Sequence, residues 1–480
     1  MIYASQYGAK LDSNIMHGGG SDDTVALQSI LDLAKDRERL TVILDGVARI
    51  SAPLIVYSNT TIICPSGNCG IYLSDNSNCY IIQNAHPCMT DIVDENITLI
   101  GGTYNHNGAH QNRFLDSPTV PDTFPLYSIS VTLSFYGIKN LLIKDVTLMN
   151  QHAYATFFSN WNNVTIQNVH IDLRDHMDGE IQDGLHFHGP GRFLTIRDVQ
   201  GNTGDDFIAI LPDEHDFVSS IEDVVIDGVQ LNGSDQGIRL LTRGTGRLDR
   251  ISIRNVIGTY RSYGFIINPW YPGRAGGNFG SISIDQVDLR ALKNNYDYAK
   301  PFLFKIGGNI ESLSLSNIHH HVPDNNRRLI EIGGNYIVDF DTPMDDEIVR
   351  AVFEEHRRDI QETEARAKLG RELAPTNIAY LSIDRLTIYE NNMSALQDAY
   401  IRNRGNIAFF RITDPTVIRF LDDNSPKGVL VKNEDPGKIR QLSIQHAMGN
   451  GLAAWVQSAA DDLGHYGFSS VDNAIARQIE

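Results

Sequence analysis

The stretch Asn140-Leu141-Leu142-Ile143-Lys144-Asp145-Val146 recurs along the chain, and this repeat decides the fold class. Six later blocks share its apolar residues at the second, fourth and seventh positions: 163–169, 193–199, 223–229, 250–256, 281–287 and 312–318. The fourth residues of successive blocks are separated by 23 to 31 residues. A self-similar unit of this length is typical of a solenoid, in which each coil buries its apolar face against its neighbours.

The pattern inside each block predicts a short strand followed by a bend. The second and fourth residues fall on one face of a strand, and the residues between them are mostly Ser, Thr, Asp or Arg. The Asn or Asp that commonly follows suits a bend, because its side chain bonds nearby backbone and it tolerates left-handed geometry. A β-sandwich with regular strand spacing is the alternative, but sandwiches seldom repeat one block so faithfully. We therefore expect an all-β solenoid.

Flanking segments extend the repeat and predict one β-helix domain over the 480 residues. Residues 96–102 resemble an earlier coil and residues 381–388 a later one. Asp22-Asp23-Thr24 leads into an amphipathic helix that would cover the open end of the apolar core. The expected organisation is a cap over residues 1–35, main coils over 40–340, an insertion over 341–375 with helical spacing near 345–370, and late coils with a C-terminal cap over 376–480.

The composition bounds the class of protein. The chain is 41% hydrophobic and 21% charged, with a formal net charge of −19. A general nucleic-acid or membrane binder would need a basic face, so neither is expected as a partner. No stretch approaches the ~18 apolar residues of a membrane span. The start at Met1 has no basic and apolar leader, which predicts a cytoplasmic protein if Met1 is native and a secreted one if a signal has been removed.

Four cysteines fall within one short segment: Cys64, Cys69, Cys79 and Cys88. Their spacing fits no common zinc signature, and four in 480 residues do not make a disulfide framework. We expect buried free thiols, although the even count also allows pairing.

Three aspartates on consecutive coils are the candidate catalytic residues. Asp183 precedes Gly184-Leu185-His186-Phe187, and Asp205-Asp206 precedes Phe207-Ile208-Ala209-Ile210. Clustered carboxylates cannot all ionise freely, so one of them can carry a proton near neutral pH and act as a general acid. Groups on adjacent coils, about 4.8 Å apart, can reach the 6.5–9.5 Å that an inverting glycosidase requires. The alternative is that the Asp-Gly and Gly-Asp-Asp residues only form turns.

Two sets of motifs carry a resemblance to known families. Tyr7-Gly8-Ala9-Lys10, Gly20-Ser21-Asp22-Asp23-Thr24 and Ala26-Leu27-Gln28 resemble the opening of pectin-lyase-like right-handed β-helix proteins. Hydrolases, lyases, epimerases and phage tailspikes share that opening, so it indicates a right-handed parallel β-helix and no particular reaction. Asp183-Gly184 and Gly204-Asp205-Asp206 resemble the catalytic motifs of the polygalacturonase family, glycoside hydrolase family 28.

The second resemblance implies roles for the aspartates. Asp205 would be the general acid, and Asp183 with Asp206 would hold and deprotonate the water of an inverting hydrolysis. The family needs no cofactor, and none is expected. We therefore expect a glycosidase that acts on a pectin-like or other uronate or neutral glycan.

The substrate-gripping residues of that family are replaced in this chain. Aligning the coils by their core residues places Gln236 where the family has the histidine of Gly-His-Gly. Its carboxylate-binding Arg-Ile-Lys would fall at Ile266-Ile267-Asn268, where both cations are missing. Arg239 lies one coil earlier. We therefore expect either a sugar other than plain polygalacturonate or a different set of residues that binds the same sugar.

Several further residues are candidates for substrate binding. The alignment places His186, Ala209 and Arg239 in a row beside the carboxylates, with Gln236 above Asp206 and His188 on the strand face of His186. The two histidines would otherwise face solvent, and we expect no metal there. Trp270 and Tyr271 could stack on a sugar ring or pack beneath a loop.

Two other functions stay open at this stage. A polysaccharide lyase would use Arg239 as its base, with a cation such as Ca²⁺ on the carboxylates neutralising a uronate. A glycan-binding β-helix of the phage type would bind sugar without cleaving it. Either way, the expected partner is a carbohydrate.

Overall fold

In the computed structural model, most of the described residues lie in β-strands. The described residues are 1–112, 131–177, 182–213, 216, 218–242, 245–269, 277–292, 302–322, 328–333, 376–390, 399–419, 428–450 and 452–470. The chain divides into two compact units, Met1–His215 with Ser219–Ser234, and Asp216–Val218 with Asp235–Glu480. The predicted helix near 345–370 lies outside the described residues, and the single-domain organisation stays a prediction.

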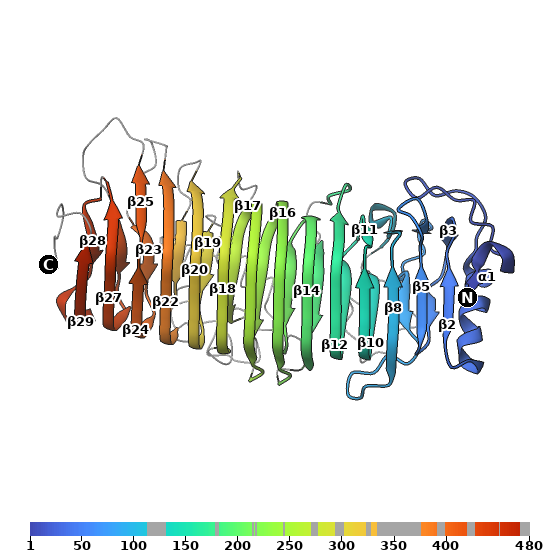
Figure 1. Ribbon diagram of the computed structural model, residues 1–480, viewed down its shortest axis with the longest axis horizontal. Coiled ribbons are helices and arrows are strands. Elements are labelled where there is room, and N and C mark those ends of the chain that lie inside the picture. The colour runs from blue at the N-terminus through green and yellow to red at the C-terminus, as the bar shows by residue number, and fades with distance from the viewer. Residues whose placement is uncertain are drawn as a thin grey trace. The chain divides into compact units, whose positions relative to one another are not determined.

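The first unit is a parallel β-helix (Figure 1). Its helices are η1 (Ala4–Tyr7), α1 (Thr24–Leu31), η2 (Asp32–Asp36) and η3 (Gly108–His110). Its strands are β1 (Ile2–Tyr3), β2 (Leu40–Ile43), β3 (Val47–Ile50), β4 (Leu54–Val56), β5 (Thr60–Ile63), β6 (Gly70–Leu73), β7 (Ile82–Asn84), β8 (Asp94–Ile100), β9 (Thr103–Asn105), β10 (Val131–Lys144), β11 (Thr147–Met149), β12 (Tyr154–Asp172), β13 (Asp183–His188), β14 (Gly191–Asn202), β15 (Asp206–Leu211) and the first part of β16 (Ile221–Thr242).

The second unit is built in the same way, from strands that pair in parallel with the equivalent strands of the next coil (Figure 1). Its elements after β16 are β17 (Leu248–Pro269), β18 (Asn278–Ala291), β19 (Phe302–Ile306), β20 (Asn309–Val322), β21 (Arg328–Ile332), β22 (Asn377–Glu390), β23 (Ala399–Asn403), β24 (Asn406–Thr413), β25 (Thr416–Arg419), β26 (Val429–Asn433), β27 (Lys438–Gly449), β28 (Ala454–Gln457), η6 (Ala460–Asp462) and β29 (Leu463–Ser470). The predicted fold class, an all-β right-handed parallel β-helix, is confirmed.

The repeated blocks stack in register, as their pattern predicts. In the first unit the fourth positions, Ile143, Ile166, Ile196 and Ile226, pair one above another, and each is fully buried. Each fully buried isoleucine contributes roughly 1.5–3 kcal/mol relative to leaving it exposed. The stack therefore gives every coil a stabilising contact with its neighbours.

Residues with left-handed backbone mark the corners of the coils. The first and sixth residues of the opening block, Asn140 and Asp145, have φ values of 56° and 57°. Asn163 and Asn168 repeat this geometry one coil later, with φ values of 57° and 50°. The Asn163 amide donates to Asn140 Oδ1 at 2.8 Å, and the Asn168 amide donates to Asp145 Oδ1 at 2.7 Å. The predicted bend is thus present, and side-chain ladders stabilise it from coil to coil.

Helix α1 forms the predicted N-terminal cap. Leu27, Ile30 and Leu31 are buried, while Val25 faces solvent. Asp23 directly precedes the helix, but its side chain makes no capping hydrogen bond: its carboxylate accepts the backbone N–H groups of Lys10 and Leu11. It therefore ties the preceding loop to the helix. Within the described part of the chain, no helix is long and apolar enough to cross a membrane.

All four cysteines are free, as expected. Cys64, Cys69 and Cys79 are buried, and Cys88 is half-buried. Burial raises the pKa of the Cys64 and Cys79 thiols to about 12.

Candidate active site

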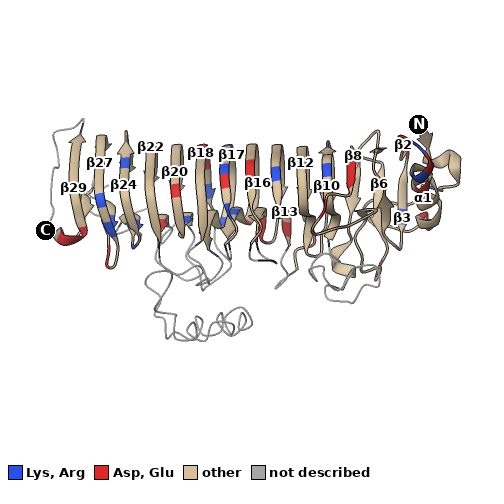
Figure 2. Cartoon of the chain, turned by 90° about the horizontal axis from the view of Figure 1, so that it is seen from below, with Lys and Arg blue, Asp and Glu red and all other residues tan. Residues whose placement is uncertain are grey.

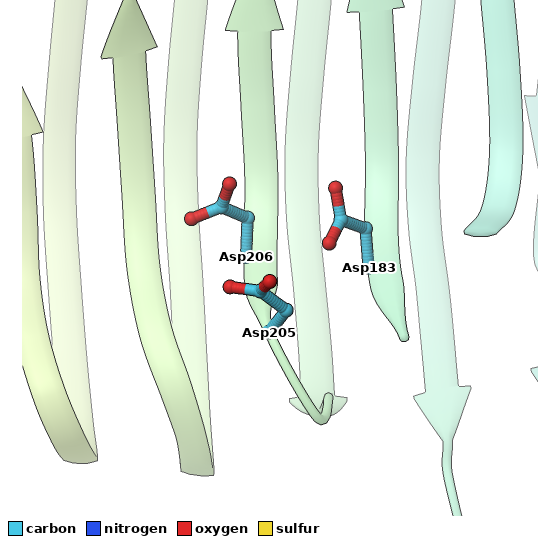
Figure 3. A group of neighbouring side chains, drawn as sticks. All are labelled: Asp183, Asp205 and Asp206. Atoms are coloured by element: carbon cyan, nitrogen blue, oxygen red, sulfur yellow. The ribbon is translucent and has the colours of Figure 1, made fainter. Parts of the chain in front are cut away.

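The three aspartates predicted from the sequence lie together in the first unit. Asp183 is the first residue of β13, and Asp206 is the first residue of β15, with Asp205 directly before it. The strands pair with Leu185 opposite Ile208, so both aspartates occupy the same level two residues earlier. Figure 3 shows the side chains of Asp183 and Asp206 on these two strands, with Asp205 beside them on the segment that leads into β15. One carboxylate oxygen from each residue lies within 4.8 Å of the others.

The backbone around the triad explains why the two strand starts come so close. A Cβ atom on Gly184 would lie 2.4 Å from the carbonyl oxygen of Phe207, so only glycine allows this approach. The carbonyl of Gln182 accepts the N–H groups of Gly204 and Asp205 at 3.0 and 3.4 Å. Local packing and backbone hydrogen bonds therefore hold the paired aspartates against Asp183.

The three carboxylates differ in their access to solvent. Asp183 and Asp206 are each 2% exposed, whereas Asp205 is half-buried. Buried carboxylates at this spacing repel one another when both are ionised. Asp205 is thus the member of the triad that is most accessible from solvent.

His186 and His188 lie beside the triad and are buried, at 3% and 2% exposure. His186 Nδ1 is 2.7 Å from Asp183 Oδ2, and His186 Nε2 is 3.0 Å from His188 Nε2. The solvent-facing alternative for these histidines is therefore excluded.

Aromatic rings pack against the two histidines. The His186 ring stacks on Tyr154, with a centroid distance of 4.1 Å and an interplanar angle of 10°. Phe157 contacts both histidines, stacked on His186 and edge-on to His188. These contacts fix the orientation of the two buried imidazoles.

Two glutamines that the sequence analysis did not single out also support the site. The Gln151 side-chain amide donates to the backbone carbonyl of Asp183 at 3.1 Å. Gln182 donates in turn to the carbonyl of Gln151 at 2.9 Å, and both glutamines are buried. No pattern in the sequence marks Gln151, because it lies outside the repeated block and 32 residues before its partner.

The remaining predicted binding residues belong to the second unit or lie outside the described chain. Gln236 and Arg239 are on the part of β16 that belongs to the second unit, half-buried and buried respectively. Their predicted place above the triad stays a prediction. Trp270 and Tyr271 lie outside the described residues.

The second unit contains a buried cation, Lys305, that is not among the predicted residues. Ile266, at a position where the resemblance led us to expect a cation, pairs with Lys305 one coil on. Lys305 is 2% exposed and donates to Glu331 at 2.7 Å. A cation therefore occupies this row of the second unit, but it bonds a carboxylate of the chain itself.

Among the described residues, the aspartate triad is the group whose donor atoms could also share a metal ion. Acidic groups at this spacing are common without one. The donor set consists of carboxylate oxygens, which suits hard cations such as Ca²⁺ or Mg²⁺ better than Zn²⁺.

Comparison with known proteins gives distant similarities. No protein-family model matches the chain. It is 26% identical over 202 residues to a polygalacturonase of Persea americana, covering 37% of this chain and 43% of that protein. The chain thus matches less than half the length of this curated relative.

Solved structures share the fold at low identity. A family 28 exopolygalacturonase of Yersinia enterocolitica aligns with a TM-score of 0.54 and 12% identity, covering 98% of this chain and 78% of that one. The tailspike protein of E. coli bacteriophage HK620, solved in complex with a hexasaccharide, aligns with a TM-score of 0.56 and 11% identity, covering 94% and 78%. The chain therefore shares the parallel β-helix fold of these proteins.

Proposed function

We propose that this divergent pectin-lyase-like β-helix protein hydrolyses a glycosidic bond, with Asp205 as general acid and Asp183 and Asp206 as the groups that hold and deprotonate water. The observation that carries the proposal is the convergence of the three carboxylates within 4.8 Å. The weak similarity to polygalacturonases supports the same class of reaction.

The proposed step accounts for every proton. Asp205 donates its proton to the glycosidic oxygen as the bond from that oxygen to the anomeric carbon breaks. The water oxygen bonds to the anomeric carbon from the opposite face, and one of its protons passes to Asp183 or Asp206. The leaving sugar keeps the proton from Asp205, and the new reducing end keeps the hydroxyl.

The spacing of the carboxylates is shorter than the sequence led us to expect. Inverting pairs are commonly about 6.5–9.5 Å apart, whereas oxygens of this triad lie within 4.8 Å of one another because all three side chains converge on one space. A water with ordinary hydrogen bonds of about 2.8 Å can bridge two oxygens at this distance. The geometry thus suits a water held jointly by Asp183 and Asp206, beside the acid.

The substrate class follows from what the chain lacks. The two cations that grip galacturonate in the polygalacturonase family have no counterparts at Ile266 and Asn268. We propose a poly- or oligosaccharide that is either neutral or held by other groups, with Arg239 and Gln236 as candidate contacts.

The decisive experiment screens defined glycans for released reducing ends with the wild type and Asp205→Asn. We expect the variant to lose about 10²–10⁴-fold in kcat, because general acid catalysis contributes about that much. Asp216→Asn, a substitution of a carboxylate outside the triad, is the matched control. Full activity in Asp205→Asn would refute the acid assignment. NMR of the first product should show the inverted anomer, and retention would refute the inverting step.

Two other functions predict different results in the same screen. A lyase would release an unsaturated uronate product and would lose activity when a chelator removes its cation. A glycan-binding protein would release nothing and would still bind sugar with all three aspartates replaced. The glycan-binding alternative is supported by the tailspike protein, which shares this fold and was solved with a bound hexasaccharide.

A further inference from the structure

Three buried side chains form a hydrogen-bonded series that begins at Asp183 of the triad. It links Asp183 Oδ2 to His186 Nδ1 at 2.7 Å, and His186 Nε2 to His188 Nε2 at 3.0 Å. All three residues are at most 3% exposed. Two imidazole nitrogens within hydrogen-bonding distance require one proton between them, so the pair cannot be doubly protonated on the facing atoms.

The direction of the first hydrogen bond follows from ordinary acid–base chemistry. A carboxyl group gives up its proton at a lower pH than an imidazole does. We therefore assign the Nδ1–H group of His186 as the donor of this bond and the Asp183 carboxylate as its acceptor. A charge-assisted bond of this length is among the stronger hydrogen bonds in proteins.

The second oxygen of Asp183 has a different environment. Asp183 Oδ1 is buried and accepts no hydrogen bond from the described residues. With Oδ2 held by His186, Oδ1 is the atom of Asp183 left to accept a proton or a hydrogen bond from a bound water.

We infer that His186, backed by His188, is a positioning residue that keeps Asp183 ionised and aims its Oδ1 at the attacking water. The hydrogen bond to His186 thereby distinguishes Asp183 from Asp206 as the carboxylate that takes the proton of the water. This inference deepens the proposed hydrolysis and rests on it for its catalytic meaning. The rings of Tyr154 and Phe157 pack against the two imidazoles and fix their orientation, and both histidines are buried.

The protonation pattern can be tested without any substrate. Nitrogen NMR of the whole protein, labelled with ¹⁵N-histidine and assigned with His186→Asn and His188→Gln, distinguishes a protonated from a bare ring nitrogen. We expect a protonated Nδ1 on His186 at neutral pH, with its proton far downfield, and an upfield shift of that proton in Asp183→Asn. A bare Nδ1 in the wild type would overturn the inference, because the proton would then belong to Asp183.

The positioning role is tested by kinetics on whichever glycan the reducing-end screen identifies. His186→Phe keeps an aromatic ring over Tyr154 but has no donor, and we expect kcat to fall about 10²-fold, the cost of a misplaced group, with KM within about twofold. His186→Asn places an amide N–H near the position of Nδ1, and it should recover part of kcat.

The control and the contrary outcome separate positioning from binding. His170 is an exposed histidine on β12, and His170→Phe should leave both constants unchanged. A rise in KM with unchanged kcat in His186→Phe would show that His186 binds substrate, and the inference would be wrong. If the wild type cleaves no glycan, hydrolysis itself fails as a function, and the nitrogen spectrum still decides the state of Asp183.

Discussion

At the scale of single residues, burial separates side chains of the same type into different chemical roles. Asp205 is half-buried, while Asp183 and Asp206 are nearly enclosed. The sequence placed all three on adjacent coils, but it could not show that His186 bonds Asp183. That contact depends on the rotamers chosen in a crowded space between two strand starts.

The cysteines are expected to differ in the reactivity of their thiols. Hydrogen bonds from Thr90 lower the pKa of Cys88, and burial raises that of Cys64 and Cys79 to about 12. Because the thiolate is the reactive form, iodoacetamide at pH 8 should label Cys88 well before the other two. Peptide mass spectrometry over time measures the order. Labelling of Cys64 or Cys79 in step with Cys88 in the native protein would contradict the burial of those thiols.

At the scale of single elements, the repeated block forms a strand between two left-handed corners. Its apolar second and fourth residues predict the buried face, and Asn or Asp at the corners predicts the bend. Exceptions such as Phe193, with a φ of 62°, show that stacking on neighbouring coils imposes the corner even on a residue that disfavours it. Sequence alone therefore predicts the common corner well and its exceptions poorly.

The corner ladder makes a prediction about stability. Asn163 has a φ of 57° and donates to Asn140. Asn163→Ala should lower the free energy of unfolding by about 1–2 kcal/mol, since a left-handed alanine costs that much, whereas Asn163→Gly should cost less because glycine adopts this geometry freely. Urea unfolding followed by circular dichroism measures both, with the exposed Lys139→Ala as control. Equal losses for Ala and Gly would mean that the ladder bond outweighs the backbone term.

At the scale of the whole molecule, charge is the property that bears on the proposed substrate. The net charge is −19, and Figure 2 shows Lys and Arg interspersed with Asp and Glu along the strands. A polyanionic glycan would be repelled at long range unless basic residues gripped it locally. The family resemblance alone would have suggested such a grip, and its two cations are missing from Ile266 and Asn268.

Salt dependence therefore distinguishes the substrate classes. If the substrate is a polyuronate bound without a basic patch, raising NaCl from 0.01 to 0.15 M shortens the screening length from about 30 to 8 Å and should raise kcat/KM. For a neutral glycan we expect no change, and a neutral osmolyte serves as control. A fall in kcat/KM with salt would instead reveal a cationic subsite, with Arg239 as the first residue to replace.

The sequence by itself determined the β-helix, its buried stack and the neighbourhood of the three aspartates. These features depend on a short periodic pattern, and each copy of the block carries the same information about which residues face inward. Only the tertiary structure decided how the carboxylates converge, which of their oxygens His186 occupies, and that Gln151 supports Asp183 from 32 residues away. Those contacts join side chains on different coils, so their geometry depends on packing between strands and leaves no periodic trace in the chain.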